Sequence, residues 1–186
     1  KTQSLFEGYK DKALMFDDKK IRKSYQDIMR NKNELSVPYE PHEIAFGEVE
    51  INNNCNLNCV MCNTHLSERK HKNMDLDLFE RILIEFKRIK KVSFSIHTIG
   101  EPLINPLLEE YFKIAKKYNI HINLSTNAQL LDKKIDLLCK YNDILDSIRF
   151  SVDGATRETY EKIRKPGKFD KLIENLTLFK DVNRDK

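Results

Sequence analysis

The segment Cys55–Cys62 reads Cys-Asn-Leu-Asn-Cys-Val-Met-Cys, which places three cysteines at C-x₃-C-x₂-C spacing. It follows an alternating stretch, Glu48–Asn52, that is typical of a short β-strand. Three of the four cysteines in the chain therefore lie in one loop after a strand. A disulfide between such near neighbours has poor geometry and would leave one of the three unpaired. The spacing instead favours a metal site.

Two kinds of metal site use clustered thiolates. Zinc in structural sites takes four ligands, and His65, three residues after Cys62, could supply the fourth. Iron–sulfur clusters also bind thiolates, ordinarily four for the cubane type. A cubane held by three cysteines keeps one iron open to a small molecule, whereas an electron-transfer protein would require four protein ligands. From this loop alone, a zinc-stabilised binding module and an electron-transfer iron–sulfur protein remain alternatives.

Strand and helix patterns alternate from Ala45 onward, which is typical of a parallel α/β sheet or barrel. Asp75 is expected to cap the first helix, and Asn105, with Pro106 at the first helical position, to begin the second. Cys139 lies on the apolar stripe of the third helix, so we expect a small buried hydrophobe rather than a ligand. The predicted strands are Glu48–Asn52, Val92–His97, Ile120–Ser125 and Ser147–Val152, and the helical stripes begin near Leu78, Leu108, Leu131, Thr156 and Phe169.

Polar and apolar residues alternate inside all four predicted strands. Parallel strands covered on both faces usually read as continuous apolar runs. A polar face on a parallel sheet implies helices on one side and a wet, ligand-filled lumen on the other. An antiparallel sheet with one solvated face is the alternative, but helix-length connections favour parallel crossovers. The polar face collects Glu48, Glu50, Asn52, Ser93, Ser95, His97, His121, Asn123, Ser125, Arg149, Ser151 and Asp153.

Length and composition bound the remaining possibilities. A chain of 186 residues with 40% hydrophobic content can bury one substantial core, which we expect to span residues 45–186. Residues 1–44 form a polar, Lys-rich extension and linker with one helical signal at Ile21, Tyr25, Ile28 and Met29. The formal charge of +4 indicates neither nucleic acid nor a membrane surface as a partner. Clustered cysteines, and the lack of a membrane-length apolar run or visible signal peptide, predict a reducing, cytoplasmic compartment.

The cysteine loop resembles that of the radical S-adenosylmethionine (SAM) superfamily, whose hallmark is a C-x₃-C-x₂-C loop after the first barrel strand. The resemblance covers about Phe46 to Asp181 and implies a partial parallel (β/α) barrel. It also implies that Cys55, Cys59 and Cys62 bind a [4Fe–4S] cluster whose fourth iron is chelated by the amino and carboxylate groups of SAM. Met61 fills the place of the family's adenine-contacting residue.

Further stretches at the ends of the predicted strands resemble SAM-binding motifs of the family. Gly100-Glu101-Pro102 resembles the motif whose glutamate and backbone hold the SAM amino group, with Ile99 in the place of its first glycine. Ser125, Thr126 and Asn127, then Ser151 and Asp153, resemble the polar strand ends that face the ribose and methionine parts. Arg164 resembles an arginine that reaches the SAM carboxylate. The residues alone leave structural roles open: turn glycines at Gly100 and Gly154, helix caps at Asn127 or Asp153, and a solvated arginine at Arg164.

The resemblance implies an enzyme that receives one electron from an external, flavodoxin- or ferredoxin-like reductant and breaks the S–C5′ bond of SAM homolytically. The 5′-deoxyadenosyl radical then abstracts hydrogen from a peptide, sugar or small metabolite bound in the lumen. The motifs Cys-Asn-Leu-x-Cys and Ser-Val-Asp-Gly are most similar to those of the SPASM/twitch branch. The family's barrel usually has six strand–helix units and this sequence supplies four, so we expect a barrel truncated after the fourth.

Overall fold

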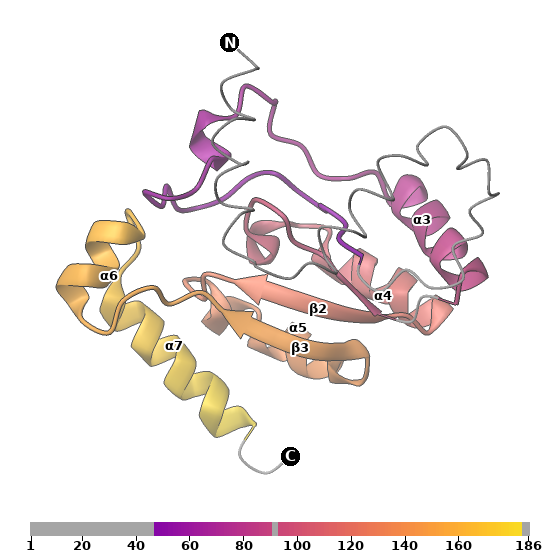
Figure 1. Ribbon diagram of the computed structural model, residues 1–186. Helices are drawn as coiled ribbons and strands as arrows, with labels where there is room; N and C mark the ends of the chain where they lie inside the picture. Colours follow the sequence, from indigo (N-terminus) through magenta and orange to yellow (C-terminus); the bar gives the residue numbers. More distant parts are fainter. Residues whose placement is uncertain (1–46, 91–92, 184–186) are drawn as a thin grey trace, which may run out of the picture. The chain divides into compact units, whose positions relative to one another are not determined.

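The computed structural model describes residues 47–90 and 93–183 (Figure 1). The predicted N-terminal extension, including its helical signal at Ile21–Met29, lies outside the described residues. In the described ranges, none of the helices combines the length and apolar character needed to cross a membrane.

In the part of the chain that the structure describes, three parallel strands form one sheet, in the order β1-β2-β3. They are β1 (Ser93–Ser95), β2 (His121–Thr126) and β3 (Leu145–Phe150). The parallel arrangement confirms the predicted crossovers and excludes the antiparallel alternative for these strands. Each of the last three predicted strands is present, with its bounds shifted by one or two residues.

The first predicted strand, Glu48–Asn52, is wrong as a regular strand. Glu48 makes only an isolated parallel bridge to Ser95, and Asn52 makes an antiparallel bridge to Asn73. Two backbone hydrogen bonds still join this segment to β1, since the Val49 amide donates to Ser95 O at 2.8 Å and the Ser95 amide donates to Gly47 O at 2.8 Å. The run Asn52-Asn53-Asn54 explains the early end of pairing, because asparagine favours strands poorly and bonds nearby backbone instead. Asn52 Nδ2 does so, donating to Asn54 O at 2.9 Å.

Within the described residues, five α-helices precede, connect and follow the strands. They are α3 (Leu76–Arg88), α4 (Leu108–Tyr118), α5 (Ile135–Lys140), α6 (Arg157–Ile163) and α7 (Phe169–Val182). Asp75 caps α3 as predicted, because its carboxylate accepts hydrogen bonds from the amides of Asp77 and Leu78. The predicted start of the second helix is wrong: Pro102–Ile104 forms a 3₁₀ turn and α4 begins only at Leu108. The Asn105 side chain instead makes two hydrogen bonds: Oδ1 accepts from the Leu107 amide, and Nδ2 donates to Ile51 O.

The apolar faces of the strands pack against helices. Along β2, buried Ile122, Leu124 and Thr126 alternate with half-buried His121, Asn123 and Ser125, as predicted. The core also contains side chains of α3, α4, α5 and α7, among them Phe79, Phe112, Leu138 and Leu172. The polar side chains share the opposite face, where Asn123 donates to Ser93 Oγ at 2.8 Å and Ser147 Oγ donates to Asn123 Oδ1 at 2.6 Å. The sheet therefore has one apolar and one polar face, the arrangement of a partial barrel.

Candidate functional site

A cavity of about 320 Å³ lies between the cysteine loop and the carboxyl ends of the strands. In Figure 1 the loop passes over the arrowheads of β2 and β3, close to α6. The cavity brings together residues from five separate stretches of the sequence. Its lining is Cys55, Leu57, Cys59, Met61, Cys62, Thr64, His97, Thr98, Ile99, Gly100, Glu101, Ser125, Thr126, Asn127, Ser151 and Arg164.

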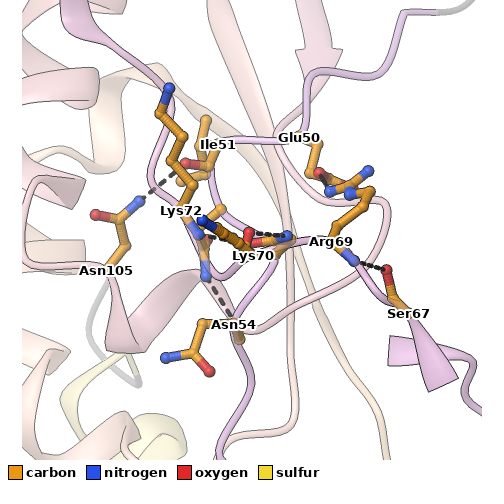
Figure 2. Close-up of polar contacts among 10 residues, drawn as sticks. Glu50, Ile51, Asn54, Ser67, Arg69, Lys70, Lys72 and Asn105 are labelled. Carbon is orange, nitrogen blue, oxygen red and sulfur yellow. Dashed lines mark hydrogen bonds and ion pairs between the residues drawn. The ribbon is translucent and has the colours of Figure 1, made fainter. Parts of the chain in front are cut away.

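The base of the cysteine loop is closed by contacts between its two ends. Figure 2 shows the segment from Glu50 to Asn54 beside the returning segment from Ser67 to Lys72. Buried Asn53 joins them, donating to Lys70 O at 3.0 Å and accepting from the Lys72 amide at 2.7 Å. Glu50 and Arg69 add an ion pair across the same junction. The cysteine-containing segment between these two stretches is therefore a compact loop whose ends are held together.

The tip of the loop is held by the end of α6. The Asn58 amide donates to Lys165 O at 2.5 Å and the Val60 amide donates to Ile163 O at 2.9 Å. A turn closed by the Cys62 amide, which donates to Cys59 O at 2.9 Å, brings the second and third cysteines close in space. Residues about 100 positions apart in the sequence thus fix where the thiols lie.

Each of the three thiols has a hydrogen-bond partner. Cys55 Sγ accepts from the Leu57 amide at 3.4 Å, Cys59 Sγ lies 3.7 Å from Arg164 Nη1, and Cys62 Sγ lies 2.9 Å from Thr64 Oγ1. Burial raises the pKa of Cys55 to about 11. Burial also raises the pKa of Cys59, against the opposing effect of the Arg164 guanidinium. The Cys55 and Cys59 thiols therefore ionise poorly by themselves, and a bound cation would supply the charge that stabilises their thiolates.

The donor set fits an iron–sulfur cluster better than a single ion. Within residues 47–90 and 93–183, no three Cys, His, Asp or Glu side chains converge closely enough to hold one metal ion. The side chain of His65, the predicted alternative zinc ligand, lies outside what the structure describes. In a cubane each thiolate binds a different iron, so the sulfurs need not meet at one point. Hydrogen bonds to the sulfurs are also a usual feature of such clusters.

Glu101 is buried in the loop that follows β1, with 2% of its surface exposed. Its Oε1 accepts from the Leu103 amide at 3.0 Å and from Thr126 Oγ1 at 2.7 Å, and its Oε2 accepts from the Asn127 amide at 2.7 Å. Burial raises the pKa of Glu101, and these donors partly oppose that rise. The carboxylate therefore ties two strand ends together, while Oε2 keeps a lone pair that a ligand could use.

Gly100 occupies a turn that only glycine fits. Its φ is +92°, and a Cβ there would lie 2.6 Å from Asn52 O and 2.9 Å from Asn54 O. Ile99, in the place of the family's first glycine, is not among the described residues with positive φ. The turn therefore requires only the second glycine of the motif.

Arg164 and Asp153 form an ion pair in which Arg164 Nε donates to Asp153 Oδ2 at 2.7 Å. The Arg164 side chain is only 13% exposed, so the alternative of a solvated arginine is wrong. The alternative of Asp153 as a helix cap is also wrong, because Thr156 caps α6. Asn127 does not cap the following helix either, because η4 (Leu131–Lys133) begins after Leu130 without a side-chain cap. Its Oδ1 accepts from the Gln129 amide, and its Nδ2 donates to Asn56 Oδ1 at 2.9 Å.

The remaining predicted site residues divide between the cavity and its surroundings. Met61 lies on the lining but is 54% exposed, whereas Pro102 is buried outside the lining, where it starts the 3₁₀ turn. Cys139 is only half-buried and does not line the cavity. Five lining residues were not among the predicted site residues: Leu57, Thr64, His97, Thr98 and Ile99. His97 carried a signal through its place on the polar face, and Leu57 and Ile99 lie inside or beside the quoted motifs.

Comparison with known proteins agrees with this arrangement. The family model described as the Radical SAM superfamily matches residues 49–186, which is most of the chain. The chain belongs to the radical SAM superfamily. Members of this superfamily are enzymes that use a [4Fe–4S] cluster and SAM.

Relatives in the superfamily carry out several different reactions. The PqqA peptide cyclase of Gluconobacter oxydans is 31% identical over 69% of this chain and 35% of its own length. The tungsten-containing aldehyde ferredoxin oxidoreductase cofactor-modifying protein of Pyrococcus furiosus is 34% identical over 56% of this chain and 30% of its own length. The chain thus spans about a third of the length of these curated relatives.

Solved structures share the fold. Streptococcus suis SuiB, bound to the precursor peptide SuiA, has a TM-score of 0.62 at 20% identity, covering 98% of this chain and 43% of SuiB. The native anSMEcpe structure with bound AdoMet has a TM-score of 0.58 at 23% identity, covering 73% of this chain and 41% of that protein. At these identities the likeness concerns the fold alone.

Proposed function

We propose that Cys55, Cys59 and Cys62 hold a [4Fe–4S] cluster at which SAM is cleaved reductively to give a 5′-deoxyadenosyl radical. The observation that carries the proposal is the set of three thiols in one pinned loop, each with a hydrogen-bond partner, beside a cavity. When bound, the cluster supplies the electron that breaks the S–C5′ bond.

The protein's own groups would position SAM and exclude water. Glu101 Oε2 is the candidate acceptor for the SAM ammonium group, because a charge-assisted hydrogen bond is strong in a shielded site. Arg164 is the candidate partner of the SAM carboxylate, which would then compete with Asp153 for the guanidinium. Ser125, Thr126, Asn127 and Ser151 line the same cavity and offer hydroxyl and amide groups to the rest of the cofactor.

The radical would abstract hydrogen from a peptide, sugar or small metabolite that lies against the polar face. Among the relatives, the PqqA peptide cyclase supports a substrate of the peptide kind. Together with the mycofactocin maturase MftC of Mycobacterium tuberculosis, it also supports the predicted SPASM/twitch branch. The electron would come from a flavodoxin- or ferredoxin-like protein. A cytoplasmic location accords with the reduced thiols that such a site requires.

Anaerobic reconstitution of the chain with iron and sulfide tests this function. With a chemical reductant and SAM, the loaded chain should form 5′-deoxyadenosine, and Cys59→Ala should abolish it while Cys139→Ala does not. Equal product from the Cys59→Ala and Cys139→Ala variants would refute the assigned ligands. A colourless protein that carries one zinc ion would favour the binding-module alternative.

A further inference from the structure

Three polar side chains stand level across the sheet, next to the cysteine cavity. The register pairs Ser95 with Asn123 and Ser125 with Arg149. His97 lies two residues beyond the end of β1, and the Ile96 amide still donates to Asn123 O at 3.2 Å, so continuing the register places His97 level with Ser125. Because side chains two residues apart point to the same face, His97, Ser125 and Arg149 project from the polar face side by side. His97 and Ser125 also line the cavity that contains the thiols.

Arg149 is exposed and has no hydrogen-bond or ion-pair partner within residues 47–90 and 93–183. Arg69, Arg157 and Arg164 differ in this respect, since each is paired with a carboxylate. A guanidinium group presents two parallel N–H donors that match the two oxygens of a carboxylate. Arg149 therefore offers an unused bidentate donor on the face that a substrate would contact.

On the other side of Ser125 from Arg149, His97 has a polar atom that lacks a hydrogen-bond partner among the described residues. Its Nδ1 is buried and has no hydrogen-bond partner in the described part of the chain. A buried ring nitrogen without a partner costs free energy, which a ligand that bonds to it would recover. Ser125 is small, so it leaves a gap between two longer side chains that stand roughly 10 Å apart at the backbone, two strand spacings.

We propose that His97 and Arg149, which flank Ser125, bind a carboxylate group of the substrate beside the cysteine loop. One cation among neutral donors suits a single negative charge better than a phosphate dianion. Glu48, on the segment that borders β1 and close enough to act on His97, also disfavours a second negative charge. This assignment rests on the proposed radical SAM function and narrows its substrate to a carboxylate-bearing molecule, such as an acidic peptide or a small carboxylic acid.

Arginine modification with phenylglyoxal tests the site in the cluster-loaded chain with saturating SAM, with each arginine followed by mass spectrometry of peptides. About 100 mM acetate should slow modification of Arg149 about threefold, which corresponds to a dissociation constant of about 50 mM. Acetamide, which has the same shape without the charge, should not slow it, and inorganic phosphate should protect less than acetate. Arg81, an exposed arginine on α3, is the matched control and should react equally in all conditions. His97→Ala should reduce the protection while leaving the rate without acetate unchanged.

The proposal would be overturned by equal protection by acetamide, by equal protection of Arg81, or by stronger protection by phosphate. Complete blocking of Arg149 by SAM alone would assign the guanidinium to the cofactor and would also overturn it. The readout needs no turnover, whereas cluster content and 5′-deoxyadenosine formation are measured separately. Failure of the carboxylate site and failure of the radical SAM function are therefore distinguishable.

Discussion

At the scale of single residues, Glu101 combines deep burial with three hydrogen bonds from the protein itself. Both carboxylate oxygens accept hydrogen bonds, so in Glu101→Gln the amide NH₂ group faces an N–H or O–H donor whichever way the amide is turned. At least one hydrogen bond is therefore lost. We expect the free energy of unfolding of the cluster-free chain to fall by about 1–3 kcal/mol. Urea titration followed by circular dichroism measures this, with exposed Glu85→Gln as the control. An unchanged midpoint with weakened SAM binding would instead assign Glu101 to the cofactor alone.

The free energy of unfolding of the chain should depend on pH through His97. Burial lowers the pKa of His97 in the folded chain below the ordinary value of a histidine. Between the two pKa values, the unfolded chain binds more protons than the folded chain. The free energy of unfolding should therefore be highest above the unfolded pKa and decline as the pH falls through the folded pKa. Urea midpoints measured from about pH 7.5 to about pH 5 should show this decline. His97→Gln should weaken the decline and exposed His71→Gln should preserve it; identical slopes in both variants would contradict the account.

At the scale of elements, the cysteine loop depends on the junction at its base. Asn53→Ala removes two hydrogen bonds from a side chain that is 5% exposed, those to Lys70 O and from the Lys72 amide. We expect a loss of about 1–3 kcal/mol in stability and faster removal of iron from the loaded chain by a chelator. Asn58→Ala is the matched control, because Asn58 is exposed in the same loop and contributes a backbone hydrogen bond. Equal rates of iron loss in the two variants would show that the junction does not hold the loop.

The elements also show which parts of the structure could be predicted from the sequence. The C-x₃-C-x₂-C spacing and the alternation along β2 are local patterns, so the loop and the two-faced sheet were predictable. The bend after Ile51 was not, because the Asn53 side chain there bonds to the backbone of Lys70 and Lys72, nearly 20 residues later in the sequence. The ion pair between Asp153 and Arg164 could not be predicted either. From the sequence alone, Asp153 could equally be a helix cap, and Arg164 could be an ordinary solvated arginine. Thr64, a partner of Cys62, carried no pattern at all.

At the scale of the whole molecule, β3 forms one edge of the three-stranded sheet that the structure describes. A cavity of about 250 Å³ lies along it, with Leu145, Ile148 and Phe179 in its lining. Open strand edges with apolar neighbours favour pairing with another chain. The 186-residue chain should therefore associate reversibly as its concentration rises, which sedimentation velocity at increasing concentrations would reveal. A constant sedimentation coefficient would indicate that the edge is already protected.

The most direct measurement of the central claim is the iron and sulfide content of the anaerobically reconstituted chain, together with the electron paramagnetic resonance spectrum of its reduced form with and without SAM. The account predicts about four irons and about four sulfides per chain, as in a cubane. It also predicts that SAM changes the spectrum, because SAM binds at the iron that Cys55, Cys59 and Cys62 leave open. A cluster whose spectrum is unaltered by SAM, or a single bound zinc ion in place of iron, would contradict the account.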